Sequence, residues 1–104
     1  MDDFIVPAKH FKFKAKKLSE KLEGSMSDSS VAYIEPHGGG PKPSHTHEHD
    51  HFFIVVKGCA TIEIGEEKLK VEEDQSVLVP GSEVHSVWNE SDELLKMIGI
   101  TIQA

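Results

Sequence analysis

Apolar and polar residues alternate along much of this chain with a period of two, the spacing of a β-strand that buries one face. The run Phe11-Lys12-Phe13-Lys14-Ala15-Lys16 is an example, and glycine, proline or asparagine separates such runs. Short strands at regular spacing, with turn residues between them, indicate an antiparallel sandwich or barrel. We predict strands at residues 11–17, 30–35, 44–47, 51–57, 59–64, 68–71, 76–79, 85–89 and 94–102.

The N-terminal third departs from this pattern in two places. Residues 18–22 have the composition of one short helical segment, and residues 24–30 are small and polar, which predicts a loop. The chain contains no internal repeat and no linker that would divide it. Its 104 residues therefore predict one domain over 1–104, with an N-terminal strand and loop at 1–29.

The charge of the chain argues against nucleic acid as a partner. The formal net charge is −7, and all eleven basic residues are lysines. Phosphate contacts and base readout depend on cationic groups, and arginine above all, so we expect no nucleic-acid binding. Six of the lysines lie between Lys9 and Lys21. Because this run alternates with apolar residues, a solvated strand face is favoured over a membrane-binding basic patch, and we expect no membrane partner.

The predicted location is the cytoplasm. Cys59 is the only cysteine, so the chain cannot form an internal disulfide, which fits a reducing compartment. The N-terminus is acidic and lacks the apolar run of a signal peptide. No stretch approaches the roughly 20 apolar residues of a membrane span.

Five of the seven histidines carry the chemical signal of the chain. They are His45, His47, His49 and His51, with His85 thirty-four residues further on. Neutral imidazole is a common ligand for divalent transition metals, since its ring nitrogen offers a lone pair at neutral pH. A built metal site, an exposed metal-scavenging tract and a solvated polar loop are the alternatives for such a cluster.

The alternation of strand residues also predicts which side chains face inward. His45 and His47 point to one side of a strand, His51 opens the next strand toward the same interior, and the intervening His49 lies on an exposed turn. Continuing this parity predicts a pocket lining, although each residue taken singly fits an ordinary core. The lining residues are Phe53, Val55, Val87 and Met97.

The outward positions of the same strands form a second apolar set. It comprises Phe52, Ile54 and Val56 with Ile98, Ile100 and Ile102. A small barrel does not usually leave so many apolar residues exposed, so we predict a homodimer.

Two stretches of the sequence resemble the two motifs of the cupin family. The first reads Gly39-x5-His45-x-His47-x3-His51-x6-Gly58, and the second is Pro80-Gly81-Ser82-Glu83-Val84-His85-x3-Asn89. The resemblance covers about residues 30–102. His51 stands where most cupins have glutamate, so the chain is similar to the smaller subset with four histidines. Ser82 and Asp74 stand where the second motif usually has glycines.

The resemblance implies an all-β fold, the antiparallel double-stranded β-helix or jelly-roll barrel. It also implies one divalent transition metal held by His45, His47, His51 and His85. Imidazole suits Mn, Fe, Co, Ni, Cu and Zn, and the resemblance makes Mn or Fe the first choice. Neither motif assigns a role to a general acid or base, so the catalytic residues remain unknown, and no residues are assigned to an organic cofactor.

Two functions are compatible with these observations. The first is a metal-dependent enzyme of the oxygenase, isomerase or decarboxylase kind, acting on a small, weakly charged organic substrate. The absence of arginine favours such a substrate, because phosphates and multiple carboxylates usually recruit the planar guanidinium group. The second is a cupin that binds or senses a small ligand without catalysis.

Overall fold

The protein is built from antiparallel strands. The computed structural model describes residues 4–19, 24–45 and 49–103, and these residues contain strands and no helix. The strands are β1 (Phe11–Ser19), β2 (Met26–His45), β3 (Asp50–Lys57), β4 (Cys59–Ile64), β5 (Glu67–Glu72), β6 (Ser76–Val79), β7 (His85–Trp88) and β8 (Leu95–Ile102). The prediction of an all-β antiparallel jelly-roll barrel is confirmed. The described residues include no helix long and apolar enough to cross a membrane.

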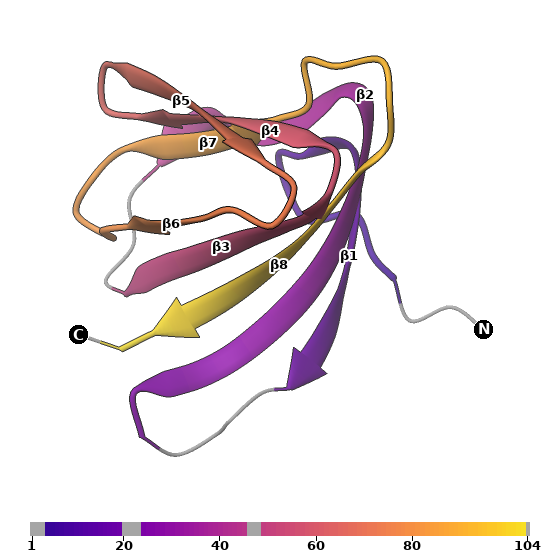
Figure 1. Cartoon of the computed structure of the whole chain (residues 1–104). Coiled ribbons are helices and arrows are strands. Elements are labelled where there is room, and N and C mark those ends of the chain that lie inside the picture. Colours follow the sequence, from indigo (N-terminus) through magenta and orange to yellow (C-terminus); the bar gives the residue numbers. More distant parts are fainter. Residues whose placement is uncertain (1–3, 20–23, 46–48, 104) are drawn as a thin grey trace.

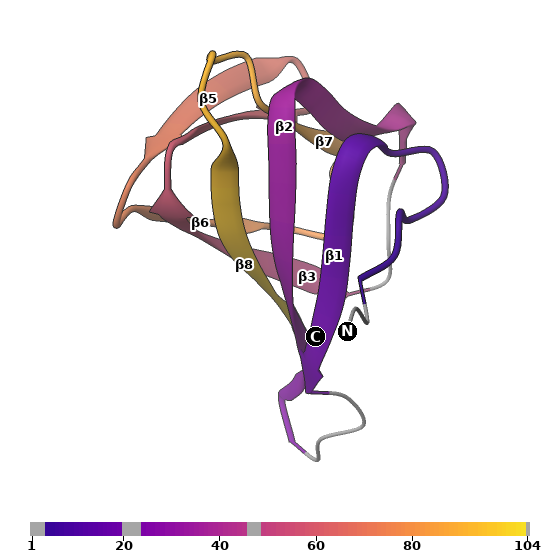
Figure 2. The ribbon, with the colours of Figure 1, turned by 90° about the vertical axis from the view of Figure 1, so that its right-hand side faces the viewer.

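The strands curl into a nearly closed barrel with two walls (Figure 1). The hydrogen-bonded order is β5-β4-β7-β2-β8-β3-β6, and β1 pairs with β2 outside this path. One wall contains β4, β5, β7 and the last residues of β2. The other wall contains β1, the first half of β2, β8, β3 and β6. Figure 2 shows β1, β2 and β8 side by side in the second wall.

Strand β2 belongs to both walls. Its first half pairs with β1 and β8, and its last residues pair with β7. The sequence predicted two separate strands here, with a turn at the proline and glycines between them, and that prediction is wrong. The glycines serve a close approach instead, because a Cβ atom added to Gly39 would lie 2.3 Å from the Val87 carbonyl oxygen and 2.6 Å from the Trp88 ring.

The predictions for the β1–β2 connection also need correction. Residues Leu18 and Ser19 continue β1 and are not helical, and the rest of the predicted helix lies outside the described residues. The predicted loop at 24–30 becomes strand from Met26 onward. Backbone pairing reaches Ser19 opposite Ser29, so cross-strand hydrogen bonds override the local preference of these residues.

The hydrophobic core fills one end of the barrel. On the inner face, Ala32 lies opposite Ala15 on one side and Met97 on the other, and Met97 lies opposite Val55. The next inward layer contains Ile34 and Leu95, which are completely buried. Apolar burial stabilises a fold by about 25 cal/mol per Å², so this end is the main source of stability. Polar side chains lie at the opposite end.

Asn89 closes the core end by joining β2 to the β7–β8 turn. Its side chain is completely buried. The Nδ2 group donates to the carbonyl oxygens of Ile34, at 2.9 Å, and Glu93, at 2.7 Å. The Oδ1 atom accepts from the backbone amide and the hydroxyl of Ser91. Asn89 is therefore a structural clamp between β2 and the β7–β8 turn.

We predict that Asn89→Ala lowers the free energy of unfolding by about 2–4 kcal/mol, because buried carbonyl groups lose their donors. Ser91→Ala is the matched control. It removes the hydroxyl that bonds to Oδ1 and to the Glu93 backbone, but it leaves both Nδ2 bonds and the Ser91 amide in place, and it should cost about 1 kcal/mol. Urea unfolding measures both values. Equal costs would contradict the assignment of Asn89 as the clamp.

Candidate functional site

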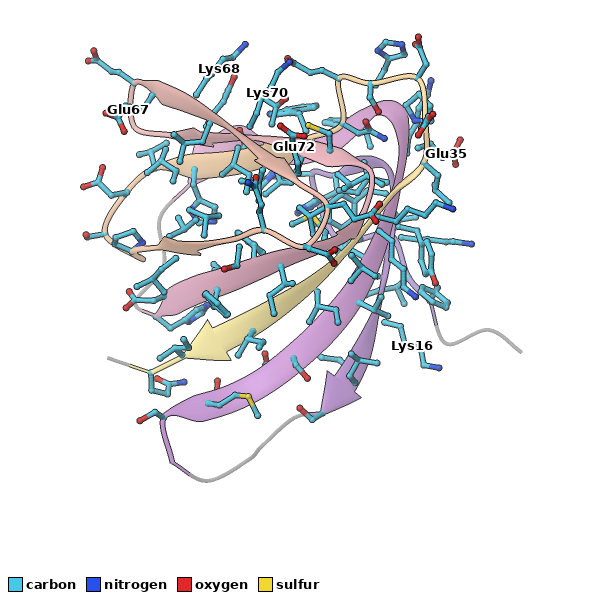
Figure 3. All side chains as sticks on the ribbon, in the orientation of Figure 1. Lys16, Glu35, Glu67, Lys68, Lys70 and Glu72 are labelled. Carbon is cyan, nitrogen blue, oxygen red and sulfur yellow. The ribbon has the colours of Figure 1, made fainter. Side chains whose placement is uncertain are left out.

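A cavity of about 370 Å³ lies at the polar end of the barrel. Its walls come from β1, β2, β3, β7 and β8, together with the segment that precedes β1. Charged side chains such as Lys16 on β1 and Glu67 on β5 project away from the barrel interior (Figure 3). Most of the charge of the chain therefore lies outside the cavity. Apart from histidines, the charged residues that line the cavity are Lys17 and Asp28.

His51 and His85 meet at this cavity. His51 is the second residue of β3, and His85 is the first residue of β7. Their ring centroids are 5.4 Å apart with an angle of 64° between the planes. The His51 ring also stacks on Phe53 at 5.4 Å. Two histidines from strands in different walls thus converge, which is the geometry that a shared ligand or metal requires.

The hydrogen bonding of His85 fits a metal ligand. Its Nδ1 atom lies 3.3 Å from the carbonyl oxygen of Glu83, and a carbonyl can only accept, so this nitrogen carries the proton. The neutral ring then has its lone pair on Nε2. Metal-binding histidines commonly hold the second nitrogen in this way, which fixes the tautomer and the ring orientation.

The other two predicted ligands are placed only in part. The backbone of His45 pairs directly opposite His85, so β2 brings it to the same end of the barrel. The side chain of His45 and the whole of His47 lie outside the described parts of the structure. Among the described residues, no three metal-binding side chains form a cluster.

His49 differs from its predicted position. It is half-buried rather than exposed, and its ring lies edge-on to that of His51 at 5.0 Å. The reason is that β3 begins at Asp50, whose carboxylate accepts a hydrogen bond from the Gly81 amide. This contact holds the start of β3 against the β6–β7 turn. The preceding residue, His49, therefore lies beside His51.

The predicted pocket lining divides into two groups. Phe53, Val87 and Met97 line the cavity. Val55 does not, because it is completely buried in the hydrophobic core together with Val71 and Val79. Parity alone placed Val55 on the correct face of β3, but its depth along the barrel axis puts it below the cavity.

Sequence reasoning missed a polar rim on the β1–β2 side of the cavity. We use "rim" for Lys17, Asp28, Ser30 and Thr101, which all line it. The Nζ atom of Lys17 lies 2.8 Å from Oδ2 of Asp28. A signal for Lys17 did exist in the sequence, because it has the inward parity of Phe13 and Ala15, whereas the preceding lysines of β1 alternate outward.

The Asp28 carboxylate is held in its charged form. Partial burial raises its pKa, but hydrogen bonds from Lys17 and Thr101 and the positive charges of Lys17 and His49 lower it, and the net pKa is below the usual carboxyl value. Asp28 thus carries a negative charge at neutral pH that Lys17 balances. The rim is polar without being strongly charged overall.

The segment before β1 forms one more wall, and it brings His10 to the cavity. The Nδ1–H group of His10 donates to the Ala8 carbonyl at 2.8 Å, and the ring packs edge-to-face on Phe13 at 4.5 Å. A Cβ atom added to Gly40 would lie 2.7 Å from the Lys9 carbonyl oxygen and 2.9 Å from the His10 Cα. Gly40 therefore gives this segment the space to pack against β2.

A family model described as a cupin domain matches residues 31–101. The chain belongs to the cupin family. Among the motif histidines of this cupin that the structure describes, His45 lies on β2, His51 on β3 and His85 on β7. None of the curated proteins matches it.

Solved structures support the fold of this cupin at low sequence identity. A cupin-2 domain from Rhodospirillum rubrum has a TM-score of 0.82 at 18% identity, covering 98% of this chain and 70% of that one. A predicted oxalate decarboxylase from Thermotoga maritima has a TM-score of 0.79 at 14% identity, covering 88% and 81%. The polyketide cyclase RemF from Streptomyces resistomycificus has a TM-score of 0.81 at 14% identity, covering 97% and 73%.

We predict that Gly40→Ala displaces the segment before β1 and lowers the free energy of unfolding by roughly 2–4 kcal/mol, because the new methyl group overlaps backbone atoms. Gly24→Ala is the matched control. Gly24 also has a positive φ, at 94°, but nothing lies within 4 Å of its added Cβ, so only the conformational cost of about 1–2 kcal/mol remains.

Urea unfolding measures the stabilities in this comparison, and hydrogen exchange of the Ala15 amide measures docking of the segment. That amide donates to the Ile5 carbonyl at 2.8 Å, so it should lose protection in Gly40→Ala and keep it in Gly24→Ala. Unchanged protection of Ala15 in both variants would contradict the role of Gly40.

Proposed function

We propose that this cupin binds one divalent transition metal through His45, His47, His51 and His85, and that it acts on a small, weakly charged organic molecule in the adjoining cavity. The observation that carries this proposal is the convergence of His51 and His85, 5.4 Å apart between ring centroids, at the cavity wall. The backbone pairing of His45 with His85 adds a third predicted ligand to the same end of the barrel.

The donor set suits an imidazole-binding metal, with Mn or Fe as first choices and Ni, Zn, Co or Cu as alternatives. Four neutral ligands leave the charge of such an ion uncompensated, so the bound metal would act as a Lewis acid toward an oxygen-bearing ligand. Phe53 supports this arrangement by stacking on His51, and the Glu83 carbonyl does so by holding Nδ1 of His85.

The walls of the cavity support a small and partly apolar ligand. Phe53, Val87 and Met97 present apolar surface, which excludes water and favours an apolar body. Lys17 is a cationic side chain at the rim that sequence reasoning missed. Its charge is balanced by Asp28, because its Nζ atom lies 2.8 Å from Oδ2 of that carboxylate. Phosphates and polycarboxylates therefore gain no uncompensated cationic partner from the rim.

Catalysis is favoured over simple binding by the polar groups around the cavity. His10, Asp28 and Lys17 all line it, so groups that can hold or move protons lie in the same cavity as the proposed metal. Oxygenation, isomerisation and decarboxylation remain the reaction classes in view, and a predicted oxalate decarboxylase and a polyketide cyclase have similar folds. Turnover assays with metal-loaded protein on phenols, diketones and small acids distinguish an enzyme from a binding or sensing module.

We predict that His51→Ala weakens metal binding by more than about 100-fold, because loss of a direct ligand costs more than the 10- to 100-fold typical of groups that only support ligands. His49→Ala is the matched control from the same segment, and it should change the affinity little. Calorimetric titration with Mn(II) or Ni(II), together with elemental analysis, measures the effect. Equal losses in both variants would identify the histidines as an unstructured chelating tract.

We also propose that two copies of the chain pair through the outer face of β3 and β8. Phe52 lies between Leu78 and Ile100, and Ile54 lies opposite Ile98, so uncharged side chains form a continuous surface. Leu78 is 50% exposed. The remaining surface carries the net charge of −7, so this uncharged face is where two identical acidic chains can meet with least repulsion.

We predict that light scattering at micromolar concentration gives twice the chain mass of 11.5 kDa. Ile100→Glu should produce the monomer, because it places a charge in the apolar face. The control is Leu94→Glu, which changes another exposed leucine outside this face and should leave the dimer intact. A monomeric unmodified protein would refute the pairing.

A further inference from the structure

Asp28 of the rim and His51 lie at opposite ends of one row of side chains across the inner face of the barrel, with Thr101 between them. Asp28 on β2 is paired with Thr101 on β8, and Thr101 is paired with His51 on β3. All three residues line the cavity. Because opposed Cα atoms in antiparallel strands are about 4.5–5.5 Å apart, the Cα atoms of Asp28 and His51 are separated by roughly 10 Å.

Beside this row, the cavity wall contains a glycine and an aromatic ring. One row deeper, Ser30 on β2 is paired with Gly99, and Gly99 is paired with Phe53. A Cβ atom added to Gly99 would lie 3.2 Å from the Phe53 ring, so the ring leans across the position where a side chain would otherwise stand. Phe53 also stacks on His51 with an angle of only 12° between the planes. A planar ligand body can therefore lie against this surface and span both ends.

The ion pair between Lys17 and Asp28 determines which polar groups of a ligand the rim can bind. The Lys17 ammonium and the Asp28 carboxylate are in contact at 2.8 Å, and the Thr101 hydroxyl also hydrogen-bonds to the carboxylate. A second anion at the rim would be attracted by Lys17 but repelled by Asp28, and a cation would meet the reverse. A neutral hydroxyl group suits both, because it donates to the carboxylate and accepts from the ammonium.

We propose that Lys17 and Asp28 form a second recognition site that binds a neutral hydroxyl group of the ligand, while the ligand's opposite, oxygen-bearing end reaches the histidines. The ligand class is a small planar acid or ketone with a hydroxyl substituent, of which the hydroxybenzoates are simple probes. This inference rests on the proposed function for its histidine end, whereas the rim end stands on the contacts of Lys17 and Asp28 alone.

Calorimetric titration of the metal-loaded protein with benzoate, 3-hydroxybenzoate, 4-hydroxybenzoate and terephthalate tests the inference. One hydroxybenzoate should bind roughly ten-fold more tightly than benzoate, since hydrogen bonds to charged groups are the stronger class. Terephthalate replaces the hydroxyl with a second carboxylate and should bind no better than benzoate. Tighter binding of terephthalate would show that the rim is a cationic anchor and would overturn the inference.

Substitutions of Lys17 and Asp28 test whether the rim causes the preference for the hydroxybenzoate. Asp28→Asn and Lys17→Gln should each reduce the preference for the hydroxybenzoate over benzoate to about two-fold or less. The ratio of the two affinities is the readout, because the changed charge of the rim acts on both anions alike. Lys16→Gln is the matched control, because Lys16 is the neighbouring lysine of β1 and projects away from the interior over the Phe4 ring. Lys17 is largely exposed, so Lys17→Gln tests the rim even if Asp28→Asn folds poorly.

The outcomes separate this inference from the proposed function. Metal-dependent binding of all four acids with equal affinity would overturn the rim inference and leave the metal site in place. A hydroxyl preference that depends on Asp28 and survives metal removal by EDTA would support the rim and contradict the role of the metal. Failure of every probe to bind would overturn the inference.

Discussion

The path of β2 through both walls of the barrel is the constraint on which the rest of the structure depends. Its first half shares hydrogen bonds with β1 and β8, and its last residues pair with β7. A strand can change partners in this way only where neighbouring backbones approach closely, and Gly39 and Gly40 provide those approaches. The same path brings Asp28, near the start of β2, and His45, at its end, to the open end of the barrel.

The hydrophobic core and the cavity lie at opposite ends of the barrel axis. The core end contains Ile34, Leu95 and Val55, which are completely buried, and Asn89 ties it closed with four side-chain hydrogen bonds. The open end contains histidines and the rim, whose polar groups would be costly to bury without partners. Polar side chains are tolerated there because the apolar layers below them supply the free energy of folding.

The balance of charge in the cavity links the structure to the proposed chemistry. In the proposed function, four neutral imidazoles would leave a bound metal strongly electrophilic, and that metal would favour an oxygen ligand. At the other end, Lys17 and Asp28 cancel each other, and the apolar surface of Phe53 lies between. A ligand with little net charge, an apolar body and two polar ends satisfies all three regions at once.

The sequence by itself determined most of the strands after β2 and the side that their residues face, because alternation is a local property of an extended backbone. Alternation therefore predicted an antiparallel barrel and the inward placement of Phe53, Val87 and Met97. The motifs that contain His51 and His85 were identified separately, by their resemblance to the cupin family. The family match and the structure confirm the barrel and the family, whereas the complete set of metal ligands stays a prediction.

Only the tertiary structure decided which inward residues reach the cavity. Val55 has the correct parity but lies too deep, whereas Lys17 and Asp28 reach the rim through the register of β1, β2 and β8. His10 reaches the cavity because Gly40 leaves room for the segment that carries it. Register and depth depend on hydrogen bonds between residues far apart in the chain, and a local pattern of apolar and polar residues contains no information about them.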